Sequence, residues 1–539
     1  MKHRLFLYAG LLVAVLSVGG CGGGGGGGNN GGGGGGGGGP GPSVTATNPV
    51  NTANGAALTQ SIVAVFSQAL NATTVNDGSF TLTGPSGPVN GTVALVDNAV
   101  HFTPLAALAF NTDYTARLTT AIQDTAGKPL AADYVWRFNT GHKIAAGGAH
   151  TCARLDDGRV KCWGDNSSGQ LGLGNTDSRG DGVNAMGQSE MGDNLPPVEL
   201  GSGRTVVEVV AGTDHTCARL DNGQVKCWGA NGTGQLGLGD INRRGDGLNA
   251  MFETEMGDNL PPVNLGNGRT AVELVAGGSH TCARLDNGAV KCWGRNNSGE
   301  LGLGDPDNRG ELGGTDPNNP AYEMGDNLPP VELGSGRTAV ELVAGGGHTC
   351  ARLDNGRVKC WGSNSFGKLG LGNTDNRGDG LNAMGETEMG DNLPPVELGT
   401  AGFFGSLTVL QLDAGADHTC ARLADPIFAG QDQVKCWGLN AFGQLGLGDI
   451  DSRGNVANEM SDNLLPVNLG NGRTAVEVVA GGNHTCARLD NGAVKCWGRN
   501  NSGQLGLGDP DNRGELGGTD PNNPAYEMGD NLPPVDLGS

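Results

Sequence analysis

Residues 280–294 read His-Thr-Cys-Ala-Arg-Leu-Asp-Asn-Gly-Ala-Val-Lys-Cys-Trp-Gly, and near copies of this stretch recur along the chain. The copies begin at His150, His215, His280, His348, His418 and His484. Successive copies lie 65, 65, 68, 70 and 66 residues apart, and each is followed by Leu-Gly-Leu-Gly, an acidic loop and a run of the Leu-Pro-Val type. A repeat of this length indicates an array of stacked supersecondary units.

The first unit contains four strand-like pieces and no helical periodicity. The pieces are Lys143–Ala146, His150–Leu155, Arg159–Trp163 and Pro197–Leu200, and later units begin with a fuller strand such as Thr205–Val210. Four short strands per unit, in a chain with 101 glycines, predict an all-β propeller of four-stranded blades. Units one to three also match units four to six in their loops, which indicates a duplicated block. This duplication favours six blades over the alternative of seven.

Each unit also carries two cysteines around a hairpin. In most units the sequence between them contains Asp-Asn-Gly, which suits a three-residue turn with glycine in the left-handed position. The cysteines then lie equally far from the turn and face each other across two strands, near the spacing that a disulfide needs. The fifth unit has a turn six residues longer, but its two arms keep their length. We therefore expect six disulfides, Cys152–Cys162, Cys217–Cys227, Cys282–Cys292, Cys350–Cys360, Cys420–Cys436 and Cys486–Cys496.

The start of the chain predicts export. A basic start at residues 2–4 precedes an apolar run at residues 5–18, and Val-Gly-Gly before Cys21 resembles the bacterial lipobox, in which the cysteine is acylated. An ordinary secretory signal is the alternative. Residues 1–21 are thus expected to be a lipoprotein signal peptide and residues 22–42 a glycine-rich flexible tether. Paired cysteines behind an export signal fit an oxidising compartment.

Residues 43–141 lack cysteine and contain short β-rich runs separated by turn residues. The runs are Ser61–Phe66, Phe80–Thr83, Thr92–Val96, Tyr114–Thr119 and Tyr134–Thr140. About seven strands in about 100 residues predict an antiparallel sandwich. Phe102-Thr103-Pro104, Asp113-Tyr114-Thr115 and the closing Trp-Arg-Phe-Asn-Thr-Gly at 136–141 resemble the S-layer type of bacterial immunoglobulin-like (Ig-like) domain, which usually serves as a spacer or stalk.

The repeats at residues 142–539 resemble the regulator of chromosome condensation type of β-propeller. In the first unit the matching residues are Gly147, His150, Thr151, Ala153, Leu155, Asp156, Gly158, Val160, Trp163, Gly164, Asn166, Gly169, Gln170, Leu171 and Gly172. Well-known members have seven blades and lack the paired cysteines. Some secreted bacterial members bind and inhibit other proteins, and the eukaryotic namesake is an exchange factor for a small GTPase. Nothing in this sequence maps onto exchange activity.

The repeated histidines and tryptophans each admit two interpretations. A zinc site needs four ligands, and each unit offers at most one histidine and two cysteines that are expected to be oxidised. A structural histidine, hydrogen-bonded inside its blade, is therefore favoured over a metal ligand. The tryptophans could form a ligand-binding ring, but packing of blade on blade is favoured because large aromatics supply burial that a glycine-rich chain lacks. These are Trp163, Trp228, Trp293, Trp361, Trp437 and Trp497.

The acidic loops after Leu-Gly-Leu-Gly are the best candidates for function, because loops on a rigid scaffold commonly carry binding sites. Asp305, Asp307, Asp509 and Asp511 faintly resemble a calcium loop. Arg309 stands where a ligand oxygen is expected, so a solvated loop held by Arg–Asp pairs is favoured, and no metal or cofactor is predicted. The loops are expected to form an acidic rim on one propeller face.

The composition and the absence of catalytic motifs argue against some classes of function. A net charge of −22 argues against a nucleic-acid partner, because it repels a phosphate backbone. The chain has no Gly-x-Ser-x-Gly elbow, His-Glu-x-x-His motif or phosphate loop, so we expect no enzyme. We expect a monomeric lipoprotein, anchored at the outer membrane or extracellular, that binds a protein or glycan as a scaffold module. A calcium-dependent adhesion module and an extracellular polymer-acting enzyme are the alternatives.

Overall fold

The computed structural model describes most of the chain beyond residue 40. The described ranges are 41–49, 62–84, 87–96, 98–105, 108, 112–140, 144–155, 157–182, 189–247, 255–312, 323–380, 387–400, 407–424, 432–515 and 527–536. The expected signal peptide, Cys21 and nearly all of the expected tether lie outside the described residues. Within these ranges, no helix is both long enough and apolar enough to span a bilayer.

Two four-stranded antiparallel sheets form the N-terminal part of the described chain. Their strand orders are β1-β2-β6-β5 and β4-β3-β7-β8. One hydrophobic core takes side chains from both sheets; Phe80, for example, lies 5.5 Å from both Phe102 and Trp136 between ring centroids. Alternation of buried and exposed residues along these strands produces the predicted sandwich. The strands are β1 (Val44–Asn48), β2 (Ile62–Phe66), β3 (Phe80–Gly84), β4 (Gly87–Pro88), β5 (Gly91–Val96), β6 (Ala99–Pro104), β7 (Asp113–Leu118) and β8 (Tyr134–Asn139).

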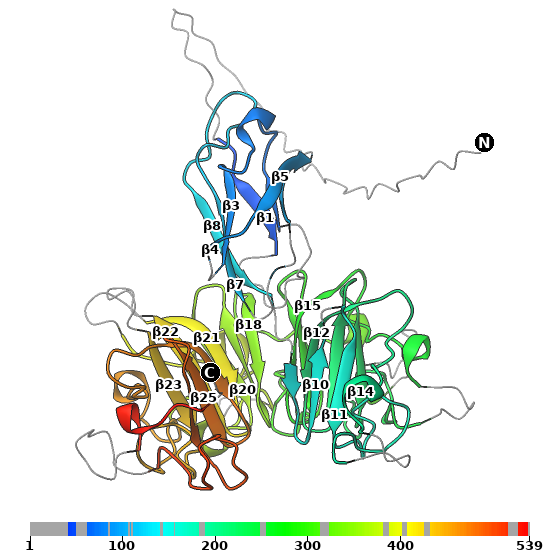
Figure 1. Cartoon of the computed structure of the whole chain (residues 1–539), viewed down its shortest axis with the longest axis vertical. Helices are drawn as coiled ribbons and strands as arrows, with labels where there is room; N and C mark the ends of the chain where they lie inside the picture. The colour runs from blue at the N-terminus through cyan, green and yellow to red at the C-terminus, as the bar shows by residue number, and fades with distance from the viewer. Residues whose placement is uncertain are drawn as a thin grey trace, which may run out of the picture. The chain divides into compact units, whose positions relative to one another are not determined.

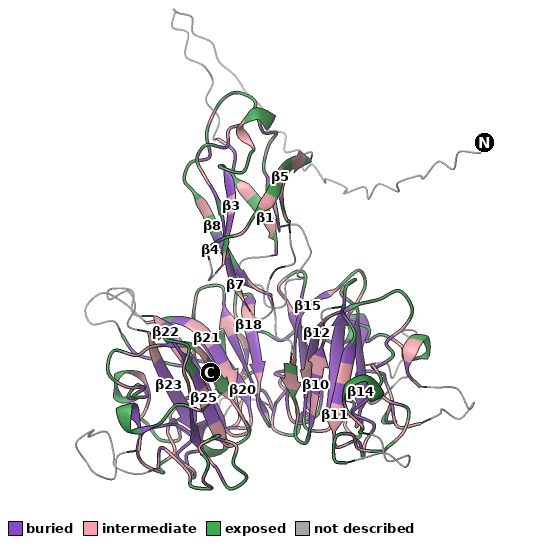
Figure 2. Cartoon of the chain, in the orientation of Figure 1, coloured by how far each residue is buried: buried purple, intermediate pink, exposed green. Residues whose placement is uncertain are grey.

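The repeats form six three-stranded antiparallel sheets within the described residues (Figure 1). In each, the motif that starts with His-Thr-Cys is the central strand. The strands are β9 (Ile144–Ala146), β10 (His150–Arg154), β11 (Val160–Gly164), β12 (Val206–Ala211), β13 (His215–Leu220), β14 (Val225–Gly229), β15 (Ala271–Ala276), β16 (His280–Leu285), β17 (Val290–Gly294), β18 (Ala339–Ala344), β19 (His348–Leu353), β20 (Val358–Gly362), β21 (Thr408–Ala414), β22 (His418–Ala424), β23 (Gln433–Gly438), β24 (Ala475–Ala480), β25 (His484–Leu489) and β26 (Val494–Gly498). Figure 2 shows that buried residues follow these strands.

The fourth expected strand of each unit differs from the prediction. The run at Pro197–Leu200 lies beside β11, but the backbone N–H of Val198 donates only one hydrogen bond to it, to Val160 O at 2.8 Å. Pro196 and Pro197 precede Val198 and have no N–H, so they cannot extend a ladder. The remaining regular structure is single 3-10 turns: η1 (Ala72–Thr74), η2 (Gly192–Asn194), η3 (Gly257–Asn259), η4 (Gly325–Asn327), η5 (Ser365–Gly367), η6 (Gly390–Asn392), η8 (Ser461–Asn463) and η9 (Gly529–Asn531).

The hairpins between the second and third strands have the predicted register. Cys217 stands directly opposite Cys227 with 4.1 Å between the Cα atoms, and the two are joined by a disulfide. The turn glycine, Gly223, has a φ of 78°, the left-handed conformation that the turn requires. The other five expected cysteine pairs are joined in the same way. In the fifth unit the extra turn residues leave the opposition of Cys420 and Cys436 intact.

A set of three hydrogen bonds, here called the inter-unit clasp, joins each unit to the next. His215 Nε2 lies 3.0 Å from Thr281 Oγ1, and the Thr281 hydroxyl donates to the backbone oxygen of Gln235 at 3.0 Å. Trp293 Nε1 donates to the same oxygen at 3.0 Å. Because the threonine hydrogen is already donated, its oxygen accepts from the histidine, which places the ring proton on Nε2. The other histidine–threonine pairs are His150–Thr216, His280–Thr349, His348–Thr419 and His418–Thr485.

The clasp corrects one sequence expectation and confirms another. The histidine is structural, but its hydrogen bond crosses to the following unit and does not stay inside its own blade. Burial lowers the pKa of His215 to about 3, so this ring is neutral and cannot serve as a base near pH 7. Trp293 is fully buried and packs unit against unit, which confirms the packing interpretation over a ligand-binding ring.

Candidate functional site

The six acidic loops leave the sheets at the ends of the third strands. In each pair of consecutive units a glycine N–H of one loop donates to a glycine oxygen of the next, as Gly174 does to Gly245 at 2.9 Å and Gly239 to Gly310 at 2.8 Å. These contacts place the loops side by side at one end of the sheets, and we call this surface the loop face. The hairpin turns lie at the other end, because the third strand runs antiparallel to the second.

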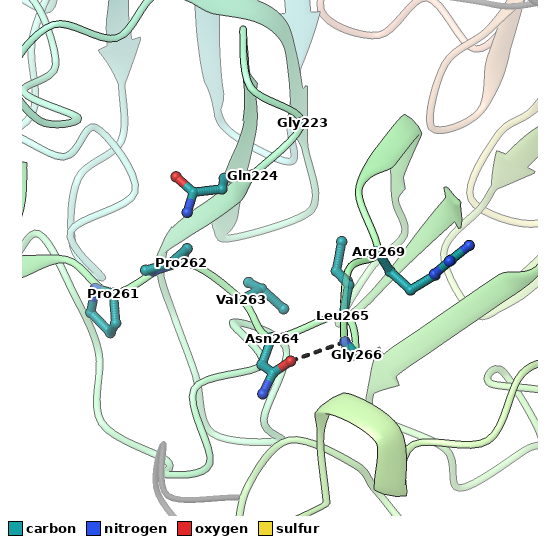
Figure 3. A pocket seen from close by; sticks show the side chains of 10 residues that line it. Gly223, Gln224, Pro261, Pro262, Val263, Asn264, Leu265, Gly266 and Arg269 are labelled. Carbon is teal, nitrogen blue, oxygen red and sulfur yellow. Dashed lines mark hydrogen bonds between the residues drawn. The ribbon is translucent and has the colours of Figure 1, made fainter. Parts of the chain in front are cut away.

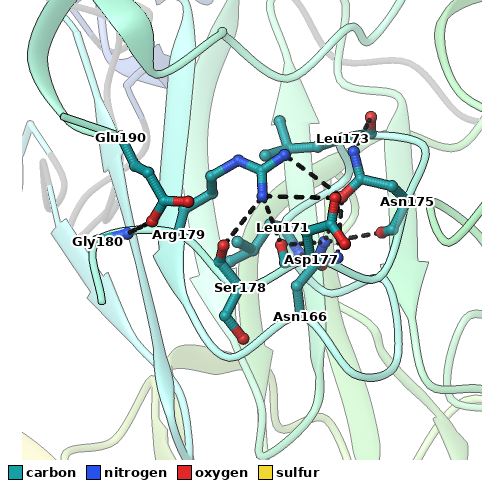
Figure 4. A network of polar contacts seen from close by, with 9 residues as sticks. All are labelled: Asn166, Leu171, Leu173, Asn175, Asp177, Ser178, Arg179, Gly180 and Glu190. Carbon is teal, nitrogen blue, oxygen red and sulfur yellow. Dashed lines mark hydrogen bonds and ion pairs between the residues drawn. The ribbon is translucent and has the colours of Figure 1, made fainter. Parts of the chain in front are cut away.

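A buried asparagine fixes the base of each loop. Asn166 Oδ1 accepts the backbone N–H of Leu171 at 2.9 Å, and its Nδ2 donates to the backbone oxygens of Asn175 and Asp177 at 2.7 and 3.0 Å (Figure 4). The side chain therefore connects both ends of the loop base. Its equivalents are Asn231, Asn296, Asn364, Asn440 and Asn500, all fully buried.

An arginine and a glutamate hold the rest of each loop. Arg244 Nη2 pairs with Asp240 at 2.7 Å, and its Nη1 donates to the backbone oxygen of Asn242. Glu255 accepts the N–H of Gly245 at 3.1 Å and so closes the loop from the other side. Burial raises the pKa of Glu255, and a hydrogen bond with Asp246 adds to the rise. The loop bases are thus rigid supports for the acidic residues that they carry.

The aspartates that resemble calcium ligands are already bound by other groups of the same chain. Asp305 pairs with Arg309 at 2.7 Å and accepts the N–H of Asp307 at 2.9 Å, and Asp509 pairs with Arg513 in the same way. In the described part of the chain, no three His, Cys, Asp or Glu side chains are grouped to hold a metal ion. The loops match the favoured interpretation, which is a solvated loop held by Arg–Asp pairs.

The segments that follow the third strands, from the acidic loop to the next 3-10 turn, concentrate the negative charge of the sequence. Between residues 175–193, 240–258, 305–326, 373–391, 449–462 and 509–530 the sequence has 30 of the 56 Asp and Glu residues but only seven of the 34 Lys and Arg residues. The resulting charge of −23 equals, within one unit, the −22 of the whole chain. At the third position of the loop, five of the six units carry an exposed aspartate: Asp177, Asp307, Asp375, Asp451 and Asp511.

A depression of about 390 Å³ lies at the opposite end of the second unit, near its hairpin (Figure 3). It is lined by Gln224, the run from Pro261 to Gly266, and Arg269. Arg269 is already paired with Asp286 at 3.3 Å. Because its one charged lining residue is already paired, the depression offers little charge with which to select a ligand.

The roles of two residues at these sites were not predicted from the sequence. The asparagine was recognised as part of the Trp-Gly-x-Asn motif, yet nothing local indicated that it fixes the loop. Asp413 in β21 has a clearer signal: it stands where the other units carry valine or alanine, as at Val210 and Val343. A residue that breaks an otherwise regular repeat is the pattern that would have identified it.

Comparison with known protein families gives matches over both parts of the chain. A family model described as the RCC1-like domain matches residues 180–534, and a model for the regulator of chromosome condensation (RCC1) repeat matches residues 142–170. A bacterial Ig-like domain model matches residues 40–140. These matches agree with the resemblances in the repeat and immunoglobulin-like segments.

Individual relatives are more distant. The ultraviolet-B receptor UVR8 of Arabidopsis thaliana is 27% identical over 408 residues, covering 68% of this chain and 78% of the relative. Protein pim1 of Schizosaccharomyces pombe is 28% identical over 381 residues, covering 68% of this chain and 60% of the relative. Yeast RCC1 (Prp20), solved bound to Kap60, is 20% identical with a TM-score of 0.48, and the alignment covers 70% of this chain and 74% of that one.

Proposed function

Because this chain belongs to the RCC1-like domain family, we propose that it is a binding or scaffold protein of the cell surface that holds a protein or glycan on its loop face. The proposal rests on one observation, which is the contrast between the fixed base of each loop and the exposed carboxylates on it. The base is fixed by buried hydrogen bonds, whereas carboxylates such as Asp307 and Asp451 are exposed on it. Pre-positioned charges on a rigid support lose little conformational entropy when a partner binds.

The proposal extends to how the protein is held. Acylation of Cys21 would anchor the chain in the outer membrane, and the glycine-rich residues 22–42 would carry the folded part away from the lipid surface. Metabolic labelling with a radioactive fatty acid tests this part. The wild-type chain should take up label and stay with the membrane, whereas Cys21→Ser should lose the label and appear in the medium. Label on the Cys21→Ser chain would contradict it.

The loop face is tested with two variants of equal charge. One replaces the five exposed loop aspartates with asparagine: Asp177, Asp307, Asp375, Asp451 and Asp511. The control replaces five aspartates of the hairpin turns, at the opposite end of the sheets: Asp157, Asp221, Asp286, Asp354 and Asp490. Both variants gain five units of charge, so a difference between them reports position and not net charge.

Each immobilised protein is incubated with outer-membrane proteins, extracellular proteins and envelope glycans. The proposal expects the loop variant to lose the ligands that the wild-type chain retains, and the turn variant to keep them. Equal retention by the two variants would place binding elsewhere. Adding calcium at millimolar concentration to the wild-type chain in a calorimeter tests the calcium-dependent alternative, which requires a heat of binding.

A further inference from the structure

The turn that follows the buried asparagine of each unit lacks one hydrogen bond in the fourth unit. Elsewhere the residue two positions after this asparagine donates its backbone N–H to a Gln or Glu side chain, as Ser168 does to Gln170 at 2.8 Å. The further pairs are Thr233–Gln235, Ser298–Glu300, Phe442–Gln444 and Ser502–Gln504. The fourth unit has Lys368 at the acceptor position, and its ammonium group pairs with Asp417 at 2.7 Å. Because an ammonium group cannot accept a hydrogen bond, the N–H of Phe366 lacks the acceptor that fixes the other turns.

Phe366 is consequently exposed in an unusual backbone conformation. Its φ is 63°, and the residue is 46% exposed. A bulky residue rarely adopts this left-handed conformation. Within the described residues, the other non-glycine residues with a positive φ are Asn458 and Ser461, both in the segment that follows the third strand of the fifth unit. Residues held in such conformations cluster at ligand-binding sites, which directs attention to the junction of these two units.

The turn of the fourth unit lies directly against the acidic loop of the fifth. A Cβ atom on Gly367 would lie 2.2 Å from the backbone nitrogen of Asn455, so the two segments touch. The residues next to this contact are Phe366 in the turn and Val456, which is 52% exposed, in the loop. We call this pair the apolar patch. At the equivalent junctions that the structure describes, at least one residue of the pair is small or polar: Ser168 and Gly247, Thr233 and Leu312, Ser298 and Gly380.

The loop of the fifth unit is shorter and less acidic at this junction. Its closing glutamate, Glu459, follows Gly454 by five residues, whereas the separation is 10 or 13 residues in the other units. Asn455 occupies a position that is acidic in every other unit. Its side-chain oxygen is buried and has no hydrogen-bond donor among the residues that the structure describes. This oxygen can therefore accept a hydrogen bond from a bound molecule.

Exposed carboxylates lie in both loops that meet at the apolar patch. A Cβ atom on Gly372 would lie 3.4 Å from the backbone oxygen of Val456, so the fourth-unit loop begins beside the patch. This loop carries Asp375, which is exposed, and the loop of Val456 itself carries the exposed Asp451. A molecule that contacts the patch thus meets apolar surface between two negatively charged loops, and a positively charged molecule complements that arrangement.

We propose that the apolar patch binds a basic protein segment, whose aliphatic side chain contacts Phe366 and Val456 while flanking lysines or arginines face Asp375 and Asp451. The proposal rests on the proposed function of the loop face and names the chemical class of its ligand. A glycan is disfavoured, because a sugar hydroxyl placed against Val456 would lose hydration without gaining a hydrogen bond. Burial of the aliphatic side chain supplies affinity, and the charges supply orientation and faster association.

The test uses the full exported chain with Cys21→Ser, which removes the expected lipid, and fluorescent peptides as probes. The basic apolar probe is Lys-Lys-Leu-Leu-Lys-Lys. Its matched controls are Lys-Lys-Ser-Ser-Lys-Lys, which lacks the aliphatic side chains, and Glu-Glu-Leu-Leu-Glu-Glu, which reverses the charge. A hexasaccharide of N-acetylglucosamine tests the glycan. Fluorescence anisotropy at about 0.15 M salt measures binding, because distant charges are largely screened at that ionic strength.

Two variants remove the patch by introducing the residues of equivalent positions. Phe366→Ser follows Ser298 of the third unit, and Val456→Gly follows Gly380 of the fourth. Both side chains are exposed, so neither change opens a cavity in a packed core. Leu312→Gly is the matched control, because Leu312 occupies the loop position of Val456 in the third unit and is 53% exposed.

A third variant tests the turn itself. Lys368→Gln introduces the residue that four other units carry and restores the acceptor for the N–H of residue 366. The turn should then take the conformation of the other units, and Phe366 should leave its position beside Val456. This variant keeps both apolar side chains, so a loss of binding would report their placement and not their presence.

The peptide Lys-Lys-Leu-Leu-Lys-Lys should bind the wild-type and Leu312→Gly chains at least about tenfold more tightly than either control peptide. Phe366→Ser and Val456→Gly should each reduce this preference at least about threefold, because each removes part of the apolar contact. Lys368→Gln should reduce it in the same direction. Retention of the full preference by Lys368→Gln would contradict the role of the turn.

Equal affinity of the wild-type chain for the leucine and serine peptides would overturn the proposal, as would an equal loss in Leu312→Gly. Binding of the hexasaccharide that Phe366→Ser abolishes would also overturn it, since the ligand would then be a glycan. The ligands that the wild-type chain retains from envelope extracts separate this proposal from the proposed function. If Phe366→Ser keeps them and the fivefold aspartate variant loses them, the loop face binds ligands but the patch does not. If both variants keep them, the proposed function fails as well.

Discussion

The carboxylate of Asp413 accepts a hydrogen bond from the backbone N–H of Ala480 at 2.8 Å, and this bond connects β21 of the fifth unit to β24 of the sixth. Burial raises the pKa of Asp413 to about 7, and the carboxylates of Glu341 and Glu477 add to the rise. The N–H groups of Ala480 and Ala414 oppose it by binding the charged form. The fifth junction therefore contains a carboxyl group that titrates near neutral pH.

Replacing Asp413 with valine, the residue of the equivalent position in other units, should make stability less dependent on pH. The pKa of Asp413 is higher in the folded chain than its ordinary 3.8, so its stabilising contribution is complete below about pH 4 and is lost as the pH rises through 7. Relative to wild type, Asp413→Val should gain on the order of 1–2 kcal/mol in unfolding free energy between pH 5 and pH 8. Urea denaturation at the two pH values measures this, with Asp451→Asn as an exposed control. An equal difference in unfolding free energy between Asp413→Val and wild type at both pH values would contradict the raised pKa of Asp413.

The tryptophans allow a comparison of one motif residue in two environments. Trp293 is fully buried and donates to the backbone oxygen of Gln235, whereas Trp163 is only half-buried. Trp293→Ala should cost about 3–5 kcal/mol of unfolding free energy, and Trp163→Ala less than half of that. Chemical denaturation measures both losses of unfolding free energy. Equal losses would mean that Trp163 is packed as fully as Trp293.

Much of this fold follows from local pattern, and the part that does not follow has a physical reason. The opposition of Cys217 and Cys227 depends on a short hairpin, so the sequence between them was sufficient to predict it. The partner of His280 is Thr349, which lies 69 residues away in another unit, and no local pattern indicates that contact. The apolar residues of the fourth run predict a fourth strand, but its prolines, such as Pro196 and Pro197, lack the N–H groups that a ladder needs.

As with the fold, only the local features of the candidate site could be predicted from the sequence. The acidic loops and their Arg–Asp pairs could be identified from residues such as Asp305 and Arg309, because the partners are four residues apart. The difference in burial between copies of the motif could not be predicted. His280 and His484 stand in the same motif, yet the first is buried and the second is partly exposed. A repeated motif does not indicate which of its copies is covered in the fold.

Acid should destabilise the propeller through its buried histidines. Burial lowers the pKa of His215 to about 3 and those of His280 and His418 to about 4, below the ordinary 6.5. The unfolded chain then binds more protons than the folded chain, so stability falls as the pH drops from about 6.5 towards 4. Each buried histidine contributes up to about 1.4 kcal/mol per pH unit in this window.

The midpoints of urea denaturation, measured at pH 7, 6, 5 and 4.5, report this loss of stability. His215→Gln is the informative variant, because the glutamine amide can donate to Thr281 but does not titrate. It should lower stability at pH 7 and flatten the decline at lower pH. His101→Gln, in the Ig-like domain and outside the repeats, is the control and should leave the slope unchanged. An unaltered slope in His215→Gln would show that other groups cause the acid sensitivity.

The disulfide of the sixth unit should be reduced before the other five. Cys486 is partly exposed, whereas its equivalents are completely buried, because the threonine of a following unit covers them; Cys217 Sγ, for example, lies 3.9 Å from Thr281 Oγ1. Thiol–disulfide exchange requires direct access of the reductant to sulfur. Brief treatment of the folded chain with a thiol reductant, followed by alkylation and peptide mass mapping, should label Cys486 and Cys496 at least about tenfold faster than the others. In urea all six pairs should react at similar rates, because no unit then covers another. Preferential labelling of Cys420 and Cys436 would instead show that the long turn of the fifth unit, and not the partial exposure of Cys486, controls access.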